Sequence, residues 1–349
     1  MTSVAMFNNK GGVGKTTLTY HLAHMLQRLG KRVLAVDLDP QSNLTAQFLD
    51  EDELAILWHE PQSPAWSAET PKYRVWSPVT EDTGTIATAL TPIREGLGDI
   101  APSQPVRITD GLWLLPGDLE LSSYEDRLSE AWGKCFTGDP AALRATTAFH
   151  RLIAHAQREV DAEIVLIDVG PNLGAINRAA LLSADTVLTP LAADLFSLRG
   201  LHNLGPTLRS WRKTWQQTVL PNAPSSISTP PGAMRPLGYV IRQPVMHLDR
   251  PVKAYQRWLD RIPAVYRDAV LDNDTSADSD FEIATMRNYQ SLMPLAHDAR
   301  KPMFELRSAD GALGSTQTLV QRCHQEFKAL SETLLDRLAA PETSTPRPR

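Results

Sequence analysis

The chain has 349 residues, of which 42% are apolar and 21% charged, so it can bury a sizeable core and is not a largely disordered protein. Its 35 basic and 40 acidic residues give a formal net charge of −5, which taken whole argues against a constitutive nucleic-acid-binding protein. Two isolated cysteines exclude a disulfide framework and a cysteine-paired metal or iron–sulfur site, and no apolar run is long enough to span a membrane. A soluble cytoplasmic protein is therefore expected.

The first forty residues predict a strand, a glycine-rich loop, a helix and a second strand. Residues 4–7 form a short apolar run, and leucine and methionine recur at helical spacing over residues 18–29. Gly30 stands where a helix C-cap glycine belongs, and residues 32–37 form a second apolar run that ends in Asp37. A strand–helix–strand unit of this kind implies a parallel sheet, so an α/β fold is expected.

The segment from about residue 51 to residue 135 breaks this pattern. Its part up to residue 116 carries eight prolines and weak periodicity, which predicts a loop-rich insertion with short helices. Its tryptophans fit local packing of the insertion better than a partner-binding surface, but both interpretations stay open. The four tryptophans are Trp58, Trp66, Trp76 and Trp113.

The rest of the chain again predicts alternating helices and strands. Residues 149–160 have a helical pattern, and residues 164–168 form a buried strand that ends in Asp168. Residues 186–191 and 236–241 are further strand candidates. One domain is expected, followed by a disordered tail. The remaining predicted segments are a proline-rich loop at 221–236, an acidic solvated loop at 272–282, an amphipathic helix at 317–338, the domain at 1–340 and the tail at 341–349.

The loop after the first strand has the composition of a phosphate-binding loop. Its glycines let several backbone N–H groups turn toward one anion, and the N-terminus of the following helix adds its positive end. Lys15 would reach the β- and γ-phosphates of a nucleotide, and the Thr16 hydroxyl would bind Mg²⁺. A strand before the loop and a helix after it supply the required context. The loop reads Asn9-Lys10-Gly11-Gly12-Val13-Gly14-Lys15-Thr16-Thr17.

This loop departs from the common phosphate-binding sequence, because Asn9 replaces its first glycine and a second lysine, Lys10, follows. It resembles the deviant Walker A motif of the ParA/MinD family of P-loop ATPases. The resemblance implies a P-loop NTPase fold, a three-layer sandwich in which helices flank a mostly parallel β-sheet. It extends, with gaps, from residue 4 to about residue 335. The further matching segments are residues 37–45, 167–171, 196–201 and 295–306.

The resemblance also implies an ATPase with weak intrinsic activity and assigns roles to its residues. ATP, and after hydrolysis ADP, would bind to Lys10 and residues 11–17. Lys15 would neutralise the phosphates of its own subunit, whereas Lys10 would reach the partner's nucleotide in an ATP-bound homodimer. Asp39 would orient the attacking water. The residues around Mg²⁺ would be Thr16, Asp37 and Asp168.

The net charge conceals an uneven distribution. Residues 195–261 hold ten basic and two acidic residues, a charge of +8, which leaves −13 for the remainder. Clustered basic residues are typical of phosphate-backbone binding, and in ParA-like proteins they hold nonspecific DNA on the ATP-bound dimer. A solvated basic face, or pairing with the acids of residues 272–282, is the alternative. The DNA-binding candidates are Arg209, Arg212, Lys213, Arg250, Lys253 and Arg257.

The expected function is that of a ParA-like ATPase that segregates or positions plasmid or chromosomal DNA. A ParB-like or other partner protein would stimulate hydrolysis, and the ATP-bound protein would associate with the bacterial nucleoid. The same switch could instead position a protein complex or serve a defence or regulatory system, and a metabolic P-loop enzyme acting on a small acidic substrate is a further alternative. A membrane role is not favoured, because the polar side of the helix at 317–338 carries acids.

Overall fold

The computed structural model describes residues 2–59, 79–80, 83–243, 252–271 and 281–340. Its strands form one eight-stranded sheet in the order β3-β4-β2-β5-β1-β6-β7-β8. All neighbouring strands are parallel except the β3–β4 hairpin. The strands are β1 Thr2–Met6, β2 Val33–Leu38, β3 Val106–Thr109, β4 Leu112–Leu115, β5 Ile164–Val169, β6 Thr186–Ala192, β7 Arg235–Arg242 and β8 Glu282–Met286.

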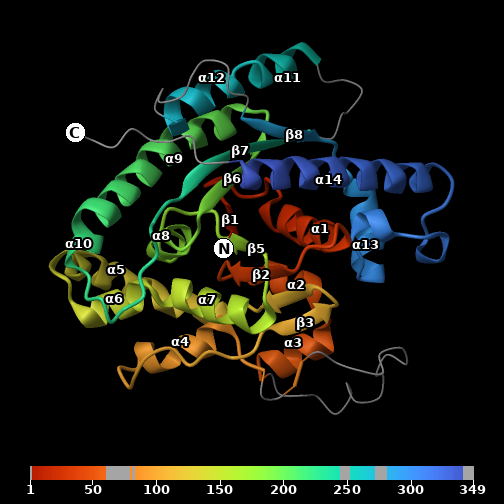
Figure 1. Ribbon diagram of the computed structural model, residues 1–349. Coiled ribbons are helices and arrows are strands. Elements are labelled where there is room, and N and C mark those ends of the chain that lie inside the picture. Colours follow the sequence, from red (N-terminus) through yellow and green to blue (C-terminus); the bar gives the residue numbers. More distant parts are fainter. Residues whose placement is uncertain (1, 60–78, 81–82, 244–251, 272–280, 341–349) are drawn as a thin grey trace.

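Helices cover both faces of this sheet, which explains why its central strands are apolar without interruption. All six residues of β5 are buried, and successive residues of β1 alternate between two cores, with Val4 in one and Ala5 in the other. Figure 1 shows α8 and α9 on one side of the strands and α1, α13 and α14 on the other. This three-layer α/β arrangement confirms the predicted fold class.

The longer helices lie where the helical periodicity of the sequence predicts them. The helices predicted over 149–160 and 317–338 are α7 and α14, and α14 buries Val320, Phe327 and Leu334 against the α1 side of the sheet. The α-helices are α1 Lys15–Arg28, α2 Asn43–Phe48, α3 Glu51–Leu57, α4 Ile86–Arg94, α5 Tyr124–Lys134, α6 Pro140–Thr146, α7 Ala148–Val160, α8 Ala175–Leu182, α9 Leu195–Thr214, α10 Leu220–Asn222, α11 Val252–Leu259, α12 Ile262–Tyr266, α13 Met293–Ala299 and α14 Ser315–Ala339.

The segment at 51–135 contains more regular structure than its sequence predicts. Besides short helices, it supplies the hairpin β3–β4, and β4 pairs in parallel with β2 at the sheet edge. Leu112 and Leu114 of β4 are fully buried by this pairing. A strand of four residues among prolines is too short to give a period-two signal, so its pairing with a distant strand is visible only in the fold.

Two of the four tryptophans in this segment can be placed: Trp58 has a contact within the segment, and Trp113 has a contact with Arg32 outside it. The Trp58 indole N–H donates to the Gly117 carbonyl oxygen at 3.3 Å, and the Arg32 guanidinium lies 4.9 Å from the centroid of the Trp113 ring. Trp66 and Trp76, most of the acidic loop at 272–282 and the tail at 341–349 lie outside the described residues. None of the helices in the described ranges is long and apolar enough to cross a membrane.

Candidate functional site

The glycine-rich loop joins β1 to α1 at the carboxyl edge of the sheet, where ligands bind in open α/β folds. Gly12 and Gly14 have φ angles of 73° and 86°, a left-handed conformation that side-chain-bearing residues rarely adopt. The Asn8 side chain fixes the start of the loop, because it donates to the Pro190 carbonyl oxygen at 2.7 Å and accepts from the Lys10 N–H at 2.9 Å. The loop is therefore shaped to turn its N–H groups toward an anion.

Lys15 opens α1 directly after the loop. Its side chain is buried, and burial lowers the pKa of its ammonium, whereas the charges of Asp168 and Asp39 raise it. The negative charges of Asp168 and Asp39 therefore offset part of the cost of burying this ammonium group. The Thr16 hydroxyl lies close enough to Asp168 to favour its ionised form, although the geometry is not that of a hydrogen bond.

The three predicted acids meet at the ends of two adjacent strands. Asp37 of β2 stands directly opposite Asp168 of β5 in the parallel register, and Asp39 follows β2 by one residue. All three are buried. The sheet order thus places Asp37, Asp39 and Asp168 on the same side of the loop, and the charges of Asp39 and Asp168 act on Lys15.

Asp37 and Asp168 differ in how their carboxylates are satisfied. The Asp37 Oδ2 atom accepts from the Thr45 N–H and hydroxyl, both at 2.8 Å, whereas neither Asp168 oxygen has a hydrogen-bond partner within the described residues. Burial raises the pKa of Asp37 to about 7, and burial followed by the charge of Asp37 raises the pKa of Asp168. A pair of buried, unsatisfied carboxylate oxygens beside a threonine hydroxyl fits a divalent cation.

No group of three or more histidine, cysteine, aspartate or glutamate side chains in the described parts of the chain has the arrangement of a metal site. A cation at Asp168 would therefore need further ligands from the Thr16 hydroxyl, water and nucleotide phosphates, which is the usual environment of Mg²⁺. The residues present fit Mg²⁺ bound together with a nucleotide.

Lys10 points away from this acidic side of the loop. Its ammonium forms an ion pair with Asp194, the N-cap residue of α9, and lies 5.9 Å from the centroid of the Phe196 ring. Burial alone raises the pKa of Asp194, but hydrogen bonds from Lys10 and from the Ser197 N–H lower it overall. Phe196 is 70% exposed and Leu195 45% exposed, so Lys10 lies beside an apolar patch on the molecular surface.

The segment between β5 and α8, residues 170–174, which is called the switch segment below, is held by Glu125, a residue that carries no recognisable signal in the sequence. Glu125 of α5 accepts from the Ala175 and Ile176 N–H groups at 2.6 and 2.9 Å, at the N-terminus of α8. Within α8, the Asn177 side chain donates to the carbonyl oxygens of Gly170 and Asn172. The segment at 51–135 is therefore tied through α5 and α8 to the loop that follows Asp168.

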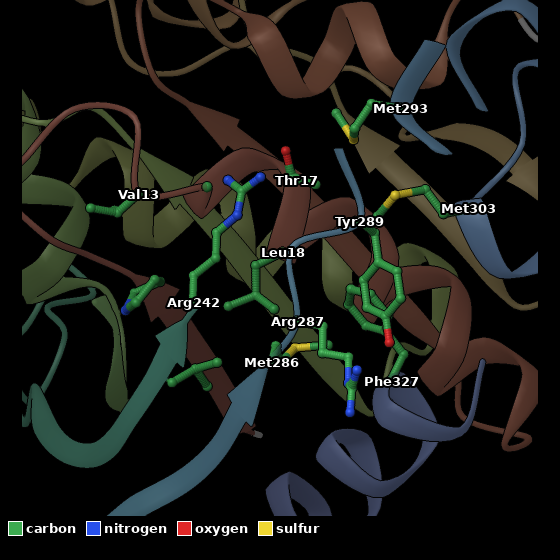
Figure 2. A pocket seen from close by; sticks show the side chains of 13 residues that line it. Val13, Thr17, Leu18, Arg242, Met286, Arg287, Tyr289, Met293, Met303 and Phe327 are labelled. Atoms are coloured by element: carbon green, nitrogen blue, oxygen red, sulfur yellow. The ribbon is translucent and has the colours of Figure 1, made fainter. Parts of the chain in front are cut away.

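A narrow apolar cleft lies on the other side of the loop, toward β7 and β8 (Figure 2). The tip of the loop, the first turn of α1 and the ends of β7 and β8 form it. Arg242 lines this cleft, and its guanidinium lies beside Gly14 of the loop. No motif in the sequence predicts that Arg242 lies at the loop. The lining includes Val13, Thr17, Leu18, Met286, Tyr289 and Phe327.

The DNA-binding candidates divide into two groups in the structure. Arg209 and Arg212 are half-buried and donate to backbone carbonyl oxygens, Arg209 to those of Ala269 and Val270 and Arg212 to that of Met234. Burial lowers the pKa of Arg212. Lys213 and Arg257 are exposed. Arg250 and the Lys253 side chain lie outside the described residues.

Comparisons with known proteins identify the family of the chain. A family model described as an AAA domain matches residues 1–220. The chromosome-partitioning ATPase Soj of Thermus thermophilus is 32% identical over 209 residues, which are 60% of this chain and 62% of that protein. The chain thus spans about three-fifths of the length of this curated relative, and 42% of the length of a putative replication protein A of Rhizobium rhizogenes.

Solved structures share the fold over nearly the whole chain. Protein DIP2308 of Corynebacterium diphtheriae is 25% identical and superimposes with a TM-score of 0.69, covering 97% of this chain and 99% of that one. The ATP complex of Cyanothece McdA superimposes with a TM-score of 0.57 at 15% identity, covering 99% of both chains. With its phosphate-binding loop and the strand-end acids around Lys15, the chain belongs to the ParA/Soj family of partition ATPases.

Proposed function

We propose that this chain is an ATP-driven switch that binds Mg²⁺ and ATP, forms a homodimer around the nucleotide and holds nonspecific DNA in that state. One observation carries the proposal: the buried ammonium of Lys15 interacts electrostatically with Asp168, whose two carboxylate oxygens are buried and have no hydrogen-bond partner within the described residues. The arrangement provides opposite charges for a phosphate group and its counter-ion in a site from which water is largely excluded.

Each residue of the site has a separate task in hydrolysis. Lys15 and the loop N–H groups neutralise the charge that accumulates on the β- and γ-phosphates. Asp168 and Thr16 would hold Mg²⁺, which supplies further neutralisation of phosphate charge when bound. Asp39 lies within the same cluster and orients the attacking water, while Asp37 anchors Thr45 and adds negative charge near the metal position.

Lys10 and the surface around it support the dimer. In the present arrangement Asp194 neutralises Lys10, so the lysine is available to a second subunit only when that ion pair opens. The exposed side chains of Leu195 and Phe196 beside it offer apolar area that a second copy would cover. Lys10 then exchanges Asp194 for the phosphates of the partner's nucleotide.

The basic segment supports DNA binding, with a changed set of residues. Arg209 and Arg212 already bind backbone carbonyl groups, so they stabilise the packing of α9 more than they offer charge to DNA. The exposed bases Lys213 and Arg257 remain candidates, together with Arg250 and Lys253. Segregation or positioning of DNA, with stimulation by a partition partner protein, is the role that the partitioning relatives suggest.

The test is binding of the full chain to a fluorescent duplex of arbitrary sequence at low salt, with ATP and Mg²⁺, with ADP, and without nucleotide. Binding and an increase from monomer to dimer mass are expected only with ATP. Lys15→Ala should abolish both, whereas Lys31→Ala, which removes an exposed lysine paired with Glu163 at 2.9 Å, should change neither. DNA binding that ignores nucleotide, or that survives Lys15→Ala, would contradict the proposal.

A further inference from the structure

Arg242 is the last residue of β7, and its side chain reaches back over the phosphate-binding loop. A Cβ atom added to Gly14 would lie only 2.7 Å from its Nη1 atom, so the guanidinium rests against the loop backbone itself. Figure 2 shows the side chain extended toward Thr17, with the apolar cleft beneath it. The contact exists because β7 ends at the same edge of the sheet as β1.

The charge of this guanidinium is not neutralised by the surrounding structure. Arg242 is half-buried, yet within the described ranges it has neither an acidic partner nor a hydrogen-bond acceptor. Burial lowers the pKa of Arg242, and no neighbouring negative charge offsets that effect. Because Gly14 is also the N-cap of α1, the positive end of the helix dipole adds to the same field. A half-buried cation at a positive helix end is unfavourable unless an anion joins it.

We propose that Arg242 is a second phosphate-contacting cation of the nucleotide site, approaching from the side opposite to Lys15. This inference rests on the proposed binding of nucleotide to the loop. The Lys15 ammonium interacts with the charges of Asp168 and Asp39 near the ends of β5 and β2, so it would bind the terminal phosphates. Arg242 comes from β7, which lies on the other side of β1. Its guanidinium would therefore contact the phosphates nearest to the nucleoside. Its planar fork can donate two hydrogen bonds to phosphate oxygens.

A second arginine in the same cleft provides a matched control. Arg287 follows β8 and also lines the cleft, but its Nε atom lies 3.3 Å from Glu326 Oε1 of α14. Its side chain is 57% exposed and points toward α14 rather than toward the loop (Figure 2). Arg287 therefore has the same chemistry and nearly the same location as Arg242, but its charge is already paired.

The experiment is calorimetric titration of the full chain, in the presence of Mg²⁺, with ADP and with inorganic pyrophosphate. Pyrophosphate carries the phosphates without the base, so the two probes separate contacts to phosphate from contacts to adenine. Arg242→Met should weaken the binding of both probes by a similar factor of about 10 to 100. Arg287→Met should change neither affinity by more than about twofold.

Two results would overturn the inference while leaving the proposed function intact. Wild-type affinity of Arg242→Met for ADP would show that the guanidinium only packs on the loop. Loss of ADP affinity with unchanged pyrophosphate affinity would move the contact to the base. If the wild-type chain binds neither probe, the proposed nucleotide site itself is wrong.

A measurement on the wild-type chain covers the case in which Arg242→Met does not fold. Phenylglyoxal modifies accessible arginine side chains, and mass spectrometry of the peptides locates them. ADP with Mg²⁺ should protect Arg242 at least several-fold and leave the modification of Arg287 unchanged. Equal modification of Arg242 with and without ADP would contradict the inference.

Discussion

The two sides of the phosphate-binding loop have opposite chemistry. On the side of β2 and β5, three carboxylates are buried, and the charges of two of them, Asp168 and Asp39, raise the pKa of the Lys15 ammonium. On the side of β7 and β8, the lining is mostly apolar, and its two charged residues are Arg242, which lies against the loop, and Arg287, which is paired with Glu326. Both sides arise from the ends of parallel strands, and β1 with its loop lies between them.

This difference predicts how a nucleotide would be oriented in the site. A nucleoside triphosphate has an anionic end that needs a metal and a water-orienting acid, and a base that favours apolar contact. The acidic side suits the terminal phosphate and the apolar side suits the base, so we expect a bound nucleotide to lie across the loop from β5 toward β8.

Asp39→Asn is expected to have the largest effect, because it removes a carboxylate of the acidic side that we assign to ATP hydrolysis. The amide keeps the size of the side chain but loses the charge that, in the proposed mechanism, would orient and polarise the attacking water. ATP turnover should fall about 100-fold or more, while ADP affinity and the ATP-dependent dimer persist. Colorimetric phosphate release and gel filtration measure these quantities.

Asp110→Asn is the control for that change, because Asp110 lies in the exposed β3–β4 turn, where its side chain is 88% exposed. Its turnover should equal that of the wild type. Unchanged hydrolysis in Asp39→Asn would remove this residue from the chemistry and leave the acidic side without an assigned catalyst.

Much of the acidic side could be predicted from sequence, because its signals are local. The strands around Asp37 and Asp168 are continuous apolar runs, and the loop residues from Gly11 to Thr17 are adjacent in the chain. Parallel strands bring their carboxyl ends to one edge, so even the meeting of the acids follows from the pattern.

The apolar side and the support of the switch could not be predicted in this way. Arg242 was one base among ten in a basic segment, and only the packing of β7 beside β6 brings it over Gly14. Glu125 lies 50 positions from the helix terminus that it caps. Such pairings depend on tertiary contacts that leave no periodic signal in one sequence.

Glu125→Gln would test whether the acidic side depends on its support from α5. The neutral amide loses the charge that favours the N-terminus of α8 and cannot accept both N–H groups equally well. We expect the free energy of unfolding in urea to fall by about 1–2 kcal/mol. We also expect turnover to fall about 10-fold, because the loop after Asp168 is less firmly held.

Asp126→Asn is the matched control for Glu125→Gln, since this neighbouring acid on α5 is exposed. It should leave turnover unchanged and alter stability by less than about 0.5 kcal/mol. A Glu125→Gln variant with reduced stability but wild-type turnover would show that α5 supports the fold and not the switch.

Asp37→Asn would test how the raised pKa of Asp37 affects the stability of the nucleotide-free protein. Burial raises the pKa of Asp37 to about 7, so between pH 4 and pH 7 the folded chain binds more protons at this residue than the unfolded chain. Its contribution to stability is therefore present at low pH and is lost as pH rises toward 7.

The Asp37→Asn variant has no titratable group at this position. As the pH rises from 4 to 7, the free energy of unfolding of the wild type should therefore fall relative to that of the variant by up to about 1 kcal/mol per pH unit. Urea unfolding at pH 5, 6 and 7 without nucleotide or Mg²⁺ measures the difference. A difference between the two proteins that stays constant with pH would contradict the raised pKa.

Met286→Ala changes the apolar side and should have the smallest effect. Met286 is buried at the end of β8, and its truncation removes part of the surface on which a base would rest. ADP affinity should fall about two- to fivefold, the equivalent of a few tens of Å² of apolar contact, with pyrophosphate affinity unchanged. An equal loss for both probes would mean that the change disturbs the loop instead.

Photo-crosslinking with 8-azido-ADP and Mg²⁺ tests the orientation of the nucleotide most directly, because the azide marks the position of the base. Excess ADP should prevent labelling. The proposed orientation predicts that the labelled peptide comes from the end of β8 and the start of α13, including Met286, Tyr289 or Met293. Labelling of residues 39–45 or 170–174, on the acidic side, would contradict it.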